Sequence, residues 1–438
     1  MKKEFLSDFF TLLNEKYQYA VLRNFADLPN DVNSHDIDLL IKEKELKSLK
    51  KDVFLLIQEY EYKVLFVNKT EKMATIVICR IVDNELEYLF LDFFLKLSLF
   101  GVYLQDADDV LVKRKFNGKV YHVHIVDEFI EKYLYNTLLN HPYPEKYKII
   151  REKVLAENYE KLLSTMQNIF GNDKIDIESF NTILGKKYLL YAFLSNLKKM
   201  PIKQIVLPFK FMFFYFKAFF FPKGFSMGLT GPDGSGKTTI LNQIQKELHS
   251  VYGRTKLHHF RPTVIPRIAE LFKKSGLKKE VDENYDKPHR GGKTSKASSW
   301  FRLLYYITDY IIGYYKVVKP VLFRRGIIIF DRYYTDIISD SKRSRIYLNY
   351  KMIFMLRKLV PNMDYNFIIF VDPELILQRK QELTREQIDE IYEKLNHICE
   401  QDKNYTPINN DAQPQIAVNA ILDNILEQQD KKYRKFFK

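Results

Sequence analysis

The feature that most constrains this chain is a glycine-rich run between residues 231 and 239. It reads Gly231-Pro-Asp-Gly-Ser-Gly-Lys-Thr-Thr239 and fits the pattern G-x-x-x-x-G-K-[ST]. The apolar run Phe225 to Thr230 precedes it, and Ile240, Ile244 and Leu248 follow it on one face of a predicted helix. This strand–loop–helix order predicts a loop that binds phosphate groups, and the alternative of an ordinary glycine-rich turn lacks any need for the lysine.

The residue types of this loop have a chemical reason. Glycine lets the backbone turn tightly enough to point its N–H groups at phosphate oxygens, at a helix N-terminus that favours anions. Lys237 supplies charge for the β- and γ-phosphates, and the hydroxyl of Thr238 is expected to hold Mg²⁺. The motif predicts ATP and Mg²⁺ as cofactors. The predicted cofactor-binding residues are Gly231, Asp233, Gly234, Ser235, Gly236, Lys237, Thr238 and Thr239.

A second motif follows 94 residues after Lys237. The segment Gly326-Ile-Ile-Ile-Phe-Asp331-Arg332 describes a buried strand whose carboxylate emerges at the carboxyl edge of a sheet, where ligands bind in open α/β folds. Asp331 is predicted to hold Mg²⁺ through water or to orient the acceptor. Arg332 is predicted to grip an acceptor phosphate with two hydrogen bonds. A surface ion pair is the alternative for this pair when it is considered alone.

Residues 225–430 resemble thymidylate kinases and their relatives in the nucleoside-monophosphate-kinase group. The resemblance rests on the loop sequence GPDGSGKTT, on FDRYY ending at Tyr334, and on Phe367-Ile-Ile-Phe-Val-Asp372-Pro-Glu, which leads to Gln378-Arg-Lys380. Arg261-Pro262 stands where the family has an Arg-Glu-Pro turn that binds the acceptor nucleotide. The resemblance implies a phosphotransferase that carries the γ-phosphoryl group of ATP to an acceptor.

The same resemblance implies residue roles and a homodimer. Lys237 and Thr238 would hold ATP·Mg, and the acceptor would be surrounded by Asp233, Arg261, Asp331, Arg332 and Tyr333. A closing lid would bring Arg379, with Lys380 or Arg385, to the transferred phosphoryl group.

The chain departs from the family pattern after FDRYY, where it has Asp340-Ser-Lys-Arg-Ser-Arg345 in place of a glutamine-containing helix. The cluster Lys342, Arg343 and Arg345 indicates an acceptor larger or more anionic than dTMP. We therefore expect dTMP or another phosphorylated or sugar-linked acceptor.

A different constellation lies in the N-terminal half. Asp36 and Asp38 alternate on a predicted strand, so their side chains share one face. Asp92 stands inside the apolar run Tyr88 to Phe94, where a buried charge needs a partner or a metal. Three aspartates on neighbouring strands could bind two Mg²⁺ ions and catalyse nucleotidyl transfer.

Residues 1–200 are weakly similar to the nucleotidyltransferase superfamily, whose D-x-D strand and third carboxylate match Asp36, Asp38 and Asp92. The Gly-Ser that usually precedes this strand is missing, and Arg23-Asn24 stands in the comparable place. Three interpretations stay open for this lobe: an active transferase, a degenerate lobe that binds a nucleotide or a partner, and an unrelated α/β domain.

The apolar periodicity predicts an α/β protein with two dissimilar halves. We expect a mixed α/β nucleotidyltransferase-like lobe over 1–128, a helical segment over 129–200 and a basic aromatic linker helix over 201–223. The remaining residues, 224–438, are predicted to form a parallel P-loop sheet with helices on both of its faces. The polar, basic stretch Lys273 to Ser299 is predicted to be a mobile loop or lid.

The linker stretch is unusual in composition. Pro201 to Pro222 contains eight phenylalanines, and Lys203, Lys210 and Lys217 recur every seven residues along one helical stripe. Each lysine near the middle of a bilayer costs about 2.5–3.5 kcal/mol, and each phenylalanine returns only about 0.3–0.6 kcal/mol, so a spanning helix is disfavoured. Either the helix packs between the two lobes, or it lies on an anionic membrane surface.

The net charge and the cysteine content limit the function classes that remain. The net charge is +14, and the only cysteines are Cys79 and Cys399, which argues for a reducing compartment. No apolar stretch reaches the roughly 18 residues of a spanning helix, and no secretory signal is recognisable. We expect a cytoplasmic protein, with a peripheral location at the inner membrane face as the alternative, and no specific nucleic acid. A further hypothesis is a non-catalytic, nucleotide-gated binding protein in which ATP orders residues 273–299.

Overall fold

The computed structural model describes residues 2–32, 35–171, 183–266, 294–380 and 382–438. The chain divides into two compact units. Unit 1 comprises residues 1–80, 87–220 and 426–438, and unit 2 comprises residues 81–86 and 221–425. The predicted domain limits stay predictions, and the units differ from them at the predicted linker 201–223, of which 201–220 group with unit 1 and 221–223 with unit 2. They also differ at two further places. The hairpin tip Ile81–Leu86 groups with unit 2, and the chain's last residues from Leu426 group with unit 1.

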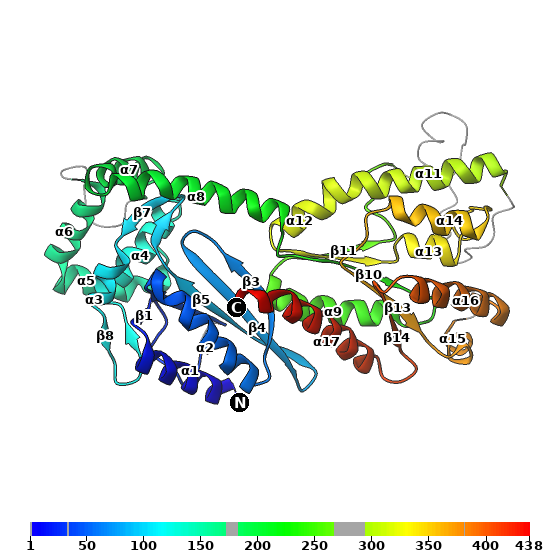
Figure 1. Cartoon of the computed structure of the whole chain (residues 1–438), viewed down its shortest axis with the longest axis horizontal. Coiled ribbons are helices and arrows are strands. Elements are labelled where there is room, and N and C mark those ends of the chain that lie inside the picture. The colour runs from blue at the N-terminus through cyan, green and yellow to red at the C-terminus, as the bar shows by residue number, and fades with distance from the viewer. Residues whose placement is uncertain (1, 33–34, 172–182, 267–293, 381) are drawn as a thin grey trace. The chain divides into compact units, whose positions relative to one another are not determined.

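Unit 1 is built on a seven-stranded mixed sheet in the order β3-β4-β5-β2-β1-β9-β8 (Figure 1). Its strands are β1 (Tyr19–Val21), β2 (Asp36–Ile41), β3 (Lys63–Lys69), β4 (Met73–Val82), β5 (Glu85–Phe94), β8 (Lys115–Phe116) and β9 (Tyr121–His122). A separate ribbon pairs β6 (Leu97–Leu99) with β7 (Val102–Gln105). The strand predicted to carry Asp36 and Asp38 is present as β2.

Helices make up the rest of unit 1. They are α1 (Lys2–Lys16), α2 (Leu46–Glu59), α3 (Ala107–Val112), α4 (Ile125–Thr137), α5 (Lys148–Glu157), α6 (Tyr159–Phe170), α7 (Lys187–Lys199) and α8 (Pro201–Phe220), with the 3-10 helices η1 (Glu43–Glu45), η2 (Glu145–Tyr147) and η5 (Arg434–Phe436). The apolar face of α4 forms a core with α5, α6 and α7 around Phe129, Tyr133 and Met166. This bundle agrees with the helical segment expected after residue 128.

Unit 2 holds a five-stranded parallel sheet in the order β11-β12-β10-β13-β14. The strands are β10 (Ser226–Thr230), β11 (Thr255–His259), β12 (Ile327–Asp331), β13 (Tyr365–Phe370) and β14 (Tyr405–Asn409). The helices are α9 (Lys237–Tyr252), α11 (Lys296–Gly313), the π-helix η3 (Tyr314–Val318), α12 (Lys319–Phe323), α13 (Tyr334–Ser339), α14 (Tyr350–Leu356), the 3-10 helix η4 (Arg357–Leu359), α15 (Pro373–Arg379), α16 (Arg385–Gln401) and α17 (Pro414–Tyr433).

The sheet of unit 2 is parallel because each strand is followed by a helical return, and helices flank both of its faces (Figure 1). Its central strands are apolar without alternation: β10 is buried along its whole length, and Ile327 to Phe330 of β12 are fully buried. The chain order reverses across β10, which has β12 on one side and β13 on the other. In such sheets this switch point opens a crevice at the carboxyl edge, where ligands bind.

Two expectations concern segments between these elements. The predicted loop Lys273 to Ser299 lies mostly in 267–293, outside the described residues, and its last part is helical instead, since α11 begins at Lys296. Ser295 caps that helix by accepting a hydrogen bond from the N–H of Ser298, a local interaction that outweighs the polar composition. No helix among the described residues is long and apolar enough to cross a bilayer.

Candidate active site

The glycine-rich loop connects β10 to α9 and is held in one conformation by its glycines. Gly234 and Gly236 adopt φ values of +88° and +83°, which strain any residue with a Cβ atom. At Gly231 a Cβ atom would stand 2.8 Å from the carbonyl oxygen of Ile369, so this position is closed to side chains by close packing on β13. The loop therefore presents the first turn of α9 at the carboxyl edge of the sheet.

Lys237 is the first residue of α9, and its side chain is buried. Its ammonium donates to the carbonyl oxygens of Gly231 (2.8 Å) and Pro232 (2.7 Å). Within the described residues it forms no ion pair with a carboxylate. Burial, together with the neighbouring charge of Arg332, lowers the pKa of Lys237 to about 8. The charges of Asp233, Asp336 and Asp331 act on Lys237 from a distance and oppose this decrease. An ammonium that is held only by neutral oxygens can exchange them for the oxygens of a bound anion.

Asp331 ends β12 and lies beside Leu229 of β10 in the parallel register, next to the start of the glycine-rich loop. The carboxylate therefore stands at the same edge of the sheet as the loop, as the sequence predicted. His259 of β11 approaches it, with Nδ1 3.1 Å from Oδ2. Burial would raise the pKa of Asp331, but the contact with His259 and the charge of Lys237 hold it below its usual value.

The oxygens of this edge suit a divalent cation. Oδ1 of Asp331 is buried and has no hydrogen-bond partner in the described structure. Thr238 is exposed on the first turn of α9. A carboxylate oxygen and a hydroxyl oxygen are ligands that Mg²⁺ accepts, usually together with several waters and phosphate oxygens. Both predicted metal positions are therefore chemically compatible with Mg²⁺, and the metal role stays a prediction.

Arg332 links the end of β12 to the glycine-rich loop. Its guanidinium forms an ion pair with Asp233, and Nη1 lies 3.7 Å from Oδ1 of Asp336. Its backbone has a φ of +74°, an uncommon conformation for a residue with a Cβ atom and one found at functional sites. Its Nε is buried and has no hydrogen-bond partner within the described residues, so one donor of this arginine is unused.

Arg343 also pairs with Asp233, from the turn that follows α13. Burial would raise the pKa of Asp233, but Arg332, Arg343 and Lys237 together hold it well below its usual range. Asp233 is consequently ionised at any physiological pH. The basic cluster noted in the sequence thus contributes one residue, Arg343, to the site.

Asp336 was missed by the sequence analysis. It lies one turn after Arg332, is buried, and its Oδ2 has no hydrogen-bond partner in the described structure. Burial raises its pKa to about 6, although the charges of Arg332 and Lys237 oppose the increase. The i, i+4 spacing from Arg332 was the available signal, but it requires knowing that a helix starts immediately after β12.

Arg261 is fixed by the buried carboxylate of Asp309, with Nη1 2.9 Å from Oδ2. Asp309 also accepts hydrogen bonds from the N–H groups of Thr263 and Ile265. The rings of Tyr305 and Tyr306 lie 5.7 and 5.6 Å from the guanidinium carbon of Arg261. Arg261 and the two rings make a cation–aromatic wall, which suits a planar or phosphorylated acceptor.

A second residue that the sequence analysis missed holds the glycine-rich loop from β14. The side-chain amide of Asn410 donates to the carbonyl oxygen of Ser235 (2.9 Å), and Asn410 is buried. A Cβ atom at Gly236 would lie 2.7 Å from the nitrogen of that amide. Asn410 follows a short strand in a polar stretch, and nothing in its sequence context marks it.

Of the predicted lid residues, Arg379 and Lys380 lie at the end of α15, and Arg385 begins α16. The Cβ atom of Lys380 and Ile376 of the same helix stand within 3.4 Å of the Cβ position of Gly234, so this helix end lies over the loop. Arg379 is exposed and makes no hydrogen bond or ion pair among the described residues. Arg385 is instead engaged on α16, where it pairs with Glu374 and Asp389. Arg379 is therefore the free arginine of this segment.

Tyr333 does not face the site in the way that the sequence suggested. Its ring is buried in the core beside Phe330 and Tyr310, and its hydroxyl donates to the carbonyl oxygen of Pro361 (2.9 Å). The geometry gives no support to acceptor binding by this side chain, because its polar atom is already satisfied away from Asp331.

Comparison with known proteins shows which family the C-terminal half of the chain resembles. Residues 229–431 match the family model described as thymidylate kinase. This segment is a thymidylate kinase-like domain. The crystal structure of thymidylate kinase from Ehrlichia chaffeensis is similar at 20% sequence identity, covering 46% of this chain and 98% of that one, with a TM-score of 0.32. A comparison with curated proteins found no match.

The thymidylate kinase-like domain makes the C-terminal half a nucleotide-binding transferase of the nucleoside-monophosphate-kinase type. The predicted P-loop lies at its start, and the strand that ends in Asp331 lies inside it. The N-terminal half carries no such match, so its resemblance to nucleotidyltransferases stays a prediction.

The N-terminal aspartates are nevertheless on neighbouring strands. β2 and β5 are parallel partners, and Asp38 is directly paired with Asp92 in their register, with Asp36 two residues earlier. Arg23 forms an ion pair with the buried carboxylate of Asp38. Among the described residues no group of three or more His, Cys, Asp or Glu is arranged to hold a metal ion, so the predicted metal role of Asp36, Asp38 and Asp92 gains no support.

Proposed function

We propose that this protein uses ATP and Mg²⁺ to phosphorylate an acceptor that already carries a phosphate or another anionic group. ATP supplies the γ-phosphoryl group, which is transferred to an oxygen of the acceptor. The proposal rests most directly on Lys237, whose buried ammonium lies at the base of a glycine-rich loop and forms no ion pair with a carboxylate in the described part of the chain. The N–H groups at the start of α9 and this cation would together bind the phosphates of a triphosphate.

Each residue of the proposed mechanism has a limited task. Lys237 would leave its loop carbonyls to neutralise the β- and γ-phosphates, and Thr238 with Asp331 would hold Mg²⁺. Arg261 and Arg332 would position the acceptor, since Arg261 is anchored by the buried carboxylate of Asp309 and Arg332 by the partly buried carboxylate of Asp233, so both lose little freedom on binding. Arg379 would add the positive charge that stabilises the transferred phosphoryl group.

The test uses the purified full-length protein with Mg·ATP and a panel of nucleoside monophosphates and sugar phosphates. We expect transfer to at least one acceptor, and a loss of about 10³-fold or more in Lys237→Ala. Lys246→Ala is the matched control, because Lys246 is an exposed lysine on the same helix. Activity that survives Lys237→Ala would contradict the proposal. Tight ATP binding without turnover on the whole panel would favour the non-catalytic, nucleotide-gated alternative.

The acceptor is proposed to be dTMP or a larger, more anionic molecule. Arg343 reaches Asp233 and so adds a positive charge beside Arg332, which favours the second alternative. The panel therefore includes dTMP together with nucleoside diphosphates and phosphorylated sugars. A preference for dTMP that is unchanged in Arg343→Ala would argue against the larger acceptor.

A second candidate activity is nucleotidyl transfer by unit 1. The observation that favours it is the pairing of Asp38 with Asp92 on adjacent parallel strands. The ion pair between Arg23 and Asp38 argues the other way, because it already neutralises one of the three carboxylates. Pyrophosphate release from nucleoside triphosphates, abolished in Asp36→Ala/Asp38→Ala but unaffected by Lys237→Ala, would establish this activity. Release that survives the double change would exclude these residues.

Two predicted partners accompany this function. A homodimer is proposed from the thymidylate kinase resemblance, and sedimentation equilibrium of the full chain tests it. A cytoplasmic location with contact to an anionic membrane surface through residues 201–223 is also proposed, since α8 is rich in exposed aromatic side chains and carries three lysines.

A further inference from the structure

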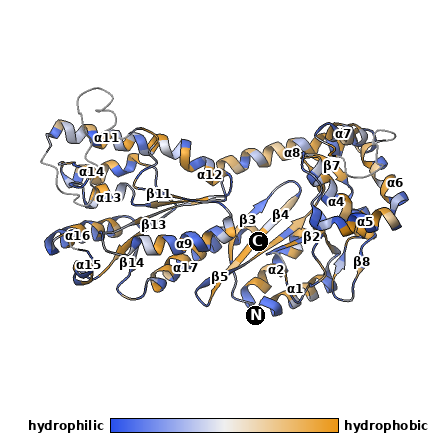
Figure 2. Ribbon diagram, turned by 180° about the vertical axis from the view of Figure 1, so that it is seen from behind, coloured by the Kyte–Doolittle hydropathy of each residue, from blue (hydrophilic) through white to orange (hydrophobic). Residues whose placement is uncertain are grey.

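Helix α8 exposes an apolar stripe along unit 1. Ile202, Ile205, Phe209, Phe213 and Phe216 recur at helical spacing, and their side chains are exposed, Phe209 to 73% and Phe213 to 62%. Only Gln204 and Leu207 of this helix are buried. Figure 2 shows orange, apolar residues along much of α8. Apolar side chains in such a row are a strong sign of an interaction surface.

Lysines border this stripe on one side. Lys203, Lys210 and Lys217 each follow a stripe residue by one position, which on a helix places them about 100° around the axis. No acidic residue occurs between Glu178 and Asp233. An apolar stripe edged by lysines is the pattern of a helix that lies in the plane of an anionic membrane interface. Because of this charge complementarity, we infer that the stripe binds a bilayer that carries anionic head groups.

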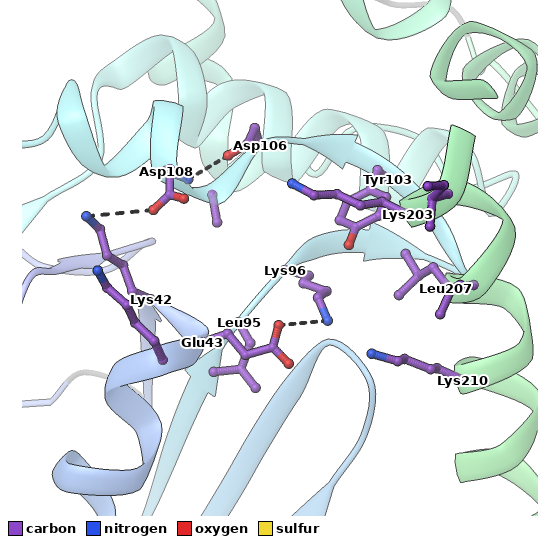
Figure 3. Close-up of a pocket in the computed structure, with 14 residues that line it drawn as sticks. Lys42, Glu43, Leu95, Lys96, Tyr103, Asp106, Asp108, Lys203, Leu207 and Lys210 are labelled. Atoms are coloured by element: carbon purple, nitrogen blue, oxygen red, sulfur yellow. Dashed lines mark hydrogen bonds and ion pairs between the residues drawn. The ribbon is translucent and has the colours of Figure 1, made fainter. Parts of the chain in front are cut away.

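A pocket of about 520 Å³ opens beside the lysine edge of α8. It lies between α8, η1, the β7–α3 connection and the end of β5, and Lys96, Lys203 and Lys210 are drawn around it in Figure 3. Its walls also include Tyr103 and the apolar side chain of Leu207. The pocket thus combines cationic ends with an apolar wall that continues onto the helix.

The charges in the pocket are not balanced within unit 1. Lys96 pairs with Glu43 at 3.0 Å, and Lys42 is 3.8 Å from Asp108. The remaining three lysines, Lys44, Lys203 and Lys210, form no ion pair among the described residues. The third acidic residue of the wall, Asp106, accepts the N–H of Asp108 as the N-cap of α3. The lining residues therefore carry a net charge of +2, from five lysines and three acidic residues.

We propose that this pocket binds the phosphate of an anionic phospholipid head group while the apolar stripe of α8 lies in the bilayer interface. The inference rests on the proposed membrane contact of residues 201–223 and adds a defined head-group site to it. Lys203 and Lys210 hold the phosphate, and Ile202, Val206 and Leu207 contact the first carbons of the lipid.

Co-sedimentation of the full chain with vesicles tests the proposal. Vesicles of phosphatidylcholine with and without about one-third phosphatidylglycerol are compared at physiological salt, because screening weakens non-specific attraction. We expect binding to the anionic vesicles only. Lys203→Gln/Lys210→Gln should weaken it roughly thirtyfold, since each lysine at a charged surface contributes about a fivefold change. Lys115→Gln/Lys119→Gln, which removes the same charge from the exposed β8–β9 hairpin, should leave it within severalfold.

A matched pair of single changes separates the pocket from general membrane contact. Lys210 lines the pocket, whereas Lys217 is also exposed on α8 and borders the same apolar stripe but does not line the pocket. The proposal requires Lys210→Gln to weaken binding clearly more than Lys217→Gln. Equal effects would overturn the head-group site while the membrane contact stands, and failure to bind anionic vesicles would overturn both.

The remaining experiments test whether a soluble anion or a second copy of the chain, and not a bilayer, binds this surface. Phe209→Ser/Phe213→Ser should weaken vesicle binding while circular dichroism and the phosphotransferase reaction stay unchanged. Inorganic phosphate, followed by calorimetry without vesicles, should show no binding that depends on Lys210. Phosphate binding lost in Lys210→Gln, or a dimer lost in the phenylalanine variant, would assign the surface to a soluble anion or a second copy and overturn the proposal.

Discussion

Arg332 forms an ion pair with Asp233, and this contact joins the end of β12 to the glycine-rich loop of the thymidylate kinase-like domain. Asp233 is shared with Arg343, and Arg332 is shared with Asp336. The two residues that the sequence placed in separate motifs are therefore one charged network. Any ligand phosphate that approaches Arg332 must be accommodated by rearranging partners that already neutralise each other.

Arg343→Ala should weaken the binding of the acceptor more than the binding of ATP. Arg343 is half-buried and Asp233 keeps Arg332, so the free energy of unfolding should fall by no more than about 1 kcal/mol. Steady-state kinetics should give a KM for the acceptor about tenfold or more higher, with the KM for ATP nearly unchanged. Lys342→Ala is the control, since its side chain pairs with Glu390 on the surface. An equal increase in both KM values would place Arg343 on the nucleotide side.

Asp309→Ala should release Arg261 from its buried anchor. An arginine left without its buried partner costs about 3–5 kcal/mol, so unfolding by urea should show a large loss of stability. Asp309→Asn should retain the fold better, and it allows kinetics to show a higher KM for the acceptor. Thr308→Ala, on the exposed face of the same helix, is the reference. Acceptor binding that is unaffected in Asp309→Asn would remove Arg261 from the acceptor site.

Asp336 should make stability depend on pH in a mildly acidic window. Its pKa in the folded protein is about 6 and its ordinary value is 3.8, so the folded state binds the proton more tightly than the unfolded state between these values. Stability from this group is therefore present below pH 4 and is lost as the pH rises to about 6. The change corresponds to roughly 3 kcal/mol.

Asp336→Asn should remove this loss. The difference in the free energy of unfolding between the variant and the original chain should grow in favour of the variant from pH 4 to pH 7, as urea titrations at each pH would measure. Asp389→Asn, on the exposed face of α16, should show no such trend. A constant difference across this range would mean that Asp336 does not titrate there.

Asn410→Ala should loosen the glycine-rich loop. The change removes the hydrogen bond to the carbonyl oxygen of Ser235, which corresponds to a loss of about 1 kcal/mol in stability. Because the loop amides are then less well ordered, the KM for ATP should rise severalfold while the KM for the acceptor stays the same. Asn409→Ala is a neighbouring control whose side chain bonds only to Asp411. Unchanged ATP kinetics would show that the loop is ordered without Asn410.

The sequence determined the parts of this protein that depend on local chemistry. A loop such as Gly231 to Thr239 needs glycine for its backbone angles, and a buried strand such as β12 needs continuous apolar residues, so both could be located without coordinates. The position of Asp331 followed as well, because parallel strands present their carboxyl ends at one edge. The aspartates of unit 1 were placed on neighbouring strands by the same argument.

Only the tertiary structure decided which charged and polar side chains pair with each other. Asp336 and Asn410 come from separate elements after α9 and belong to no motif. The basic cluster that contains Arg343 was visible in the sequence, but its pairing with Asp233 was not. Tyr333 lies within a motif, yet its ring went to the core. The reason is that the charge and hydrogen bonding of a buried group depend on its neighbours in space, which local sequence spacing does not encode.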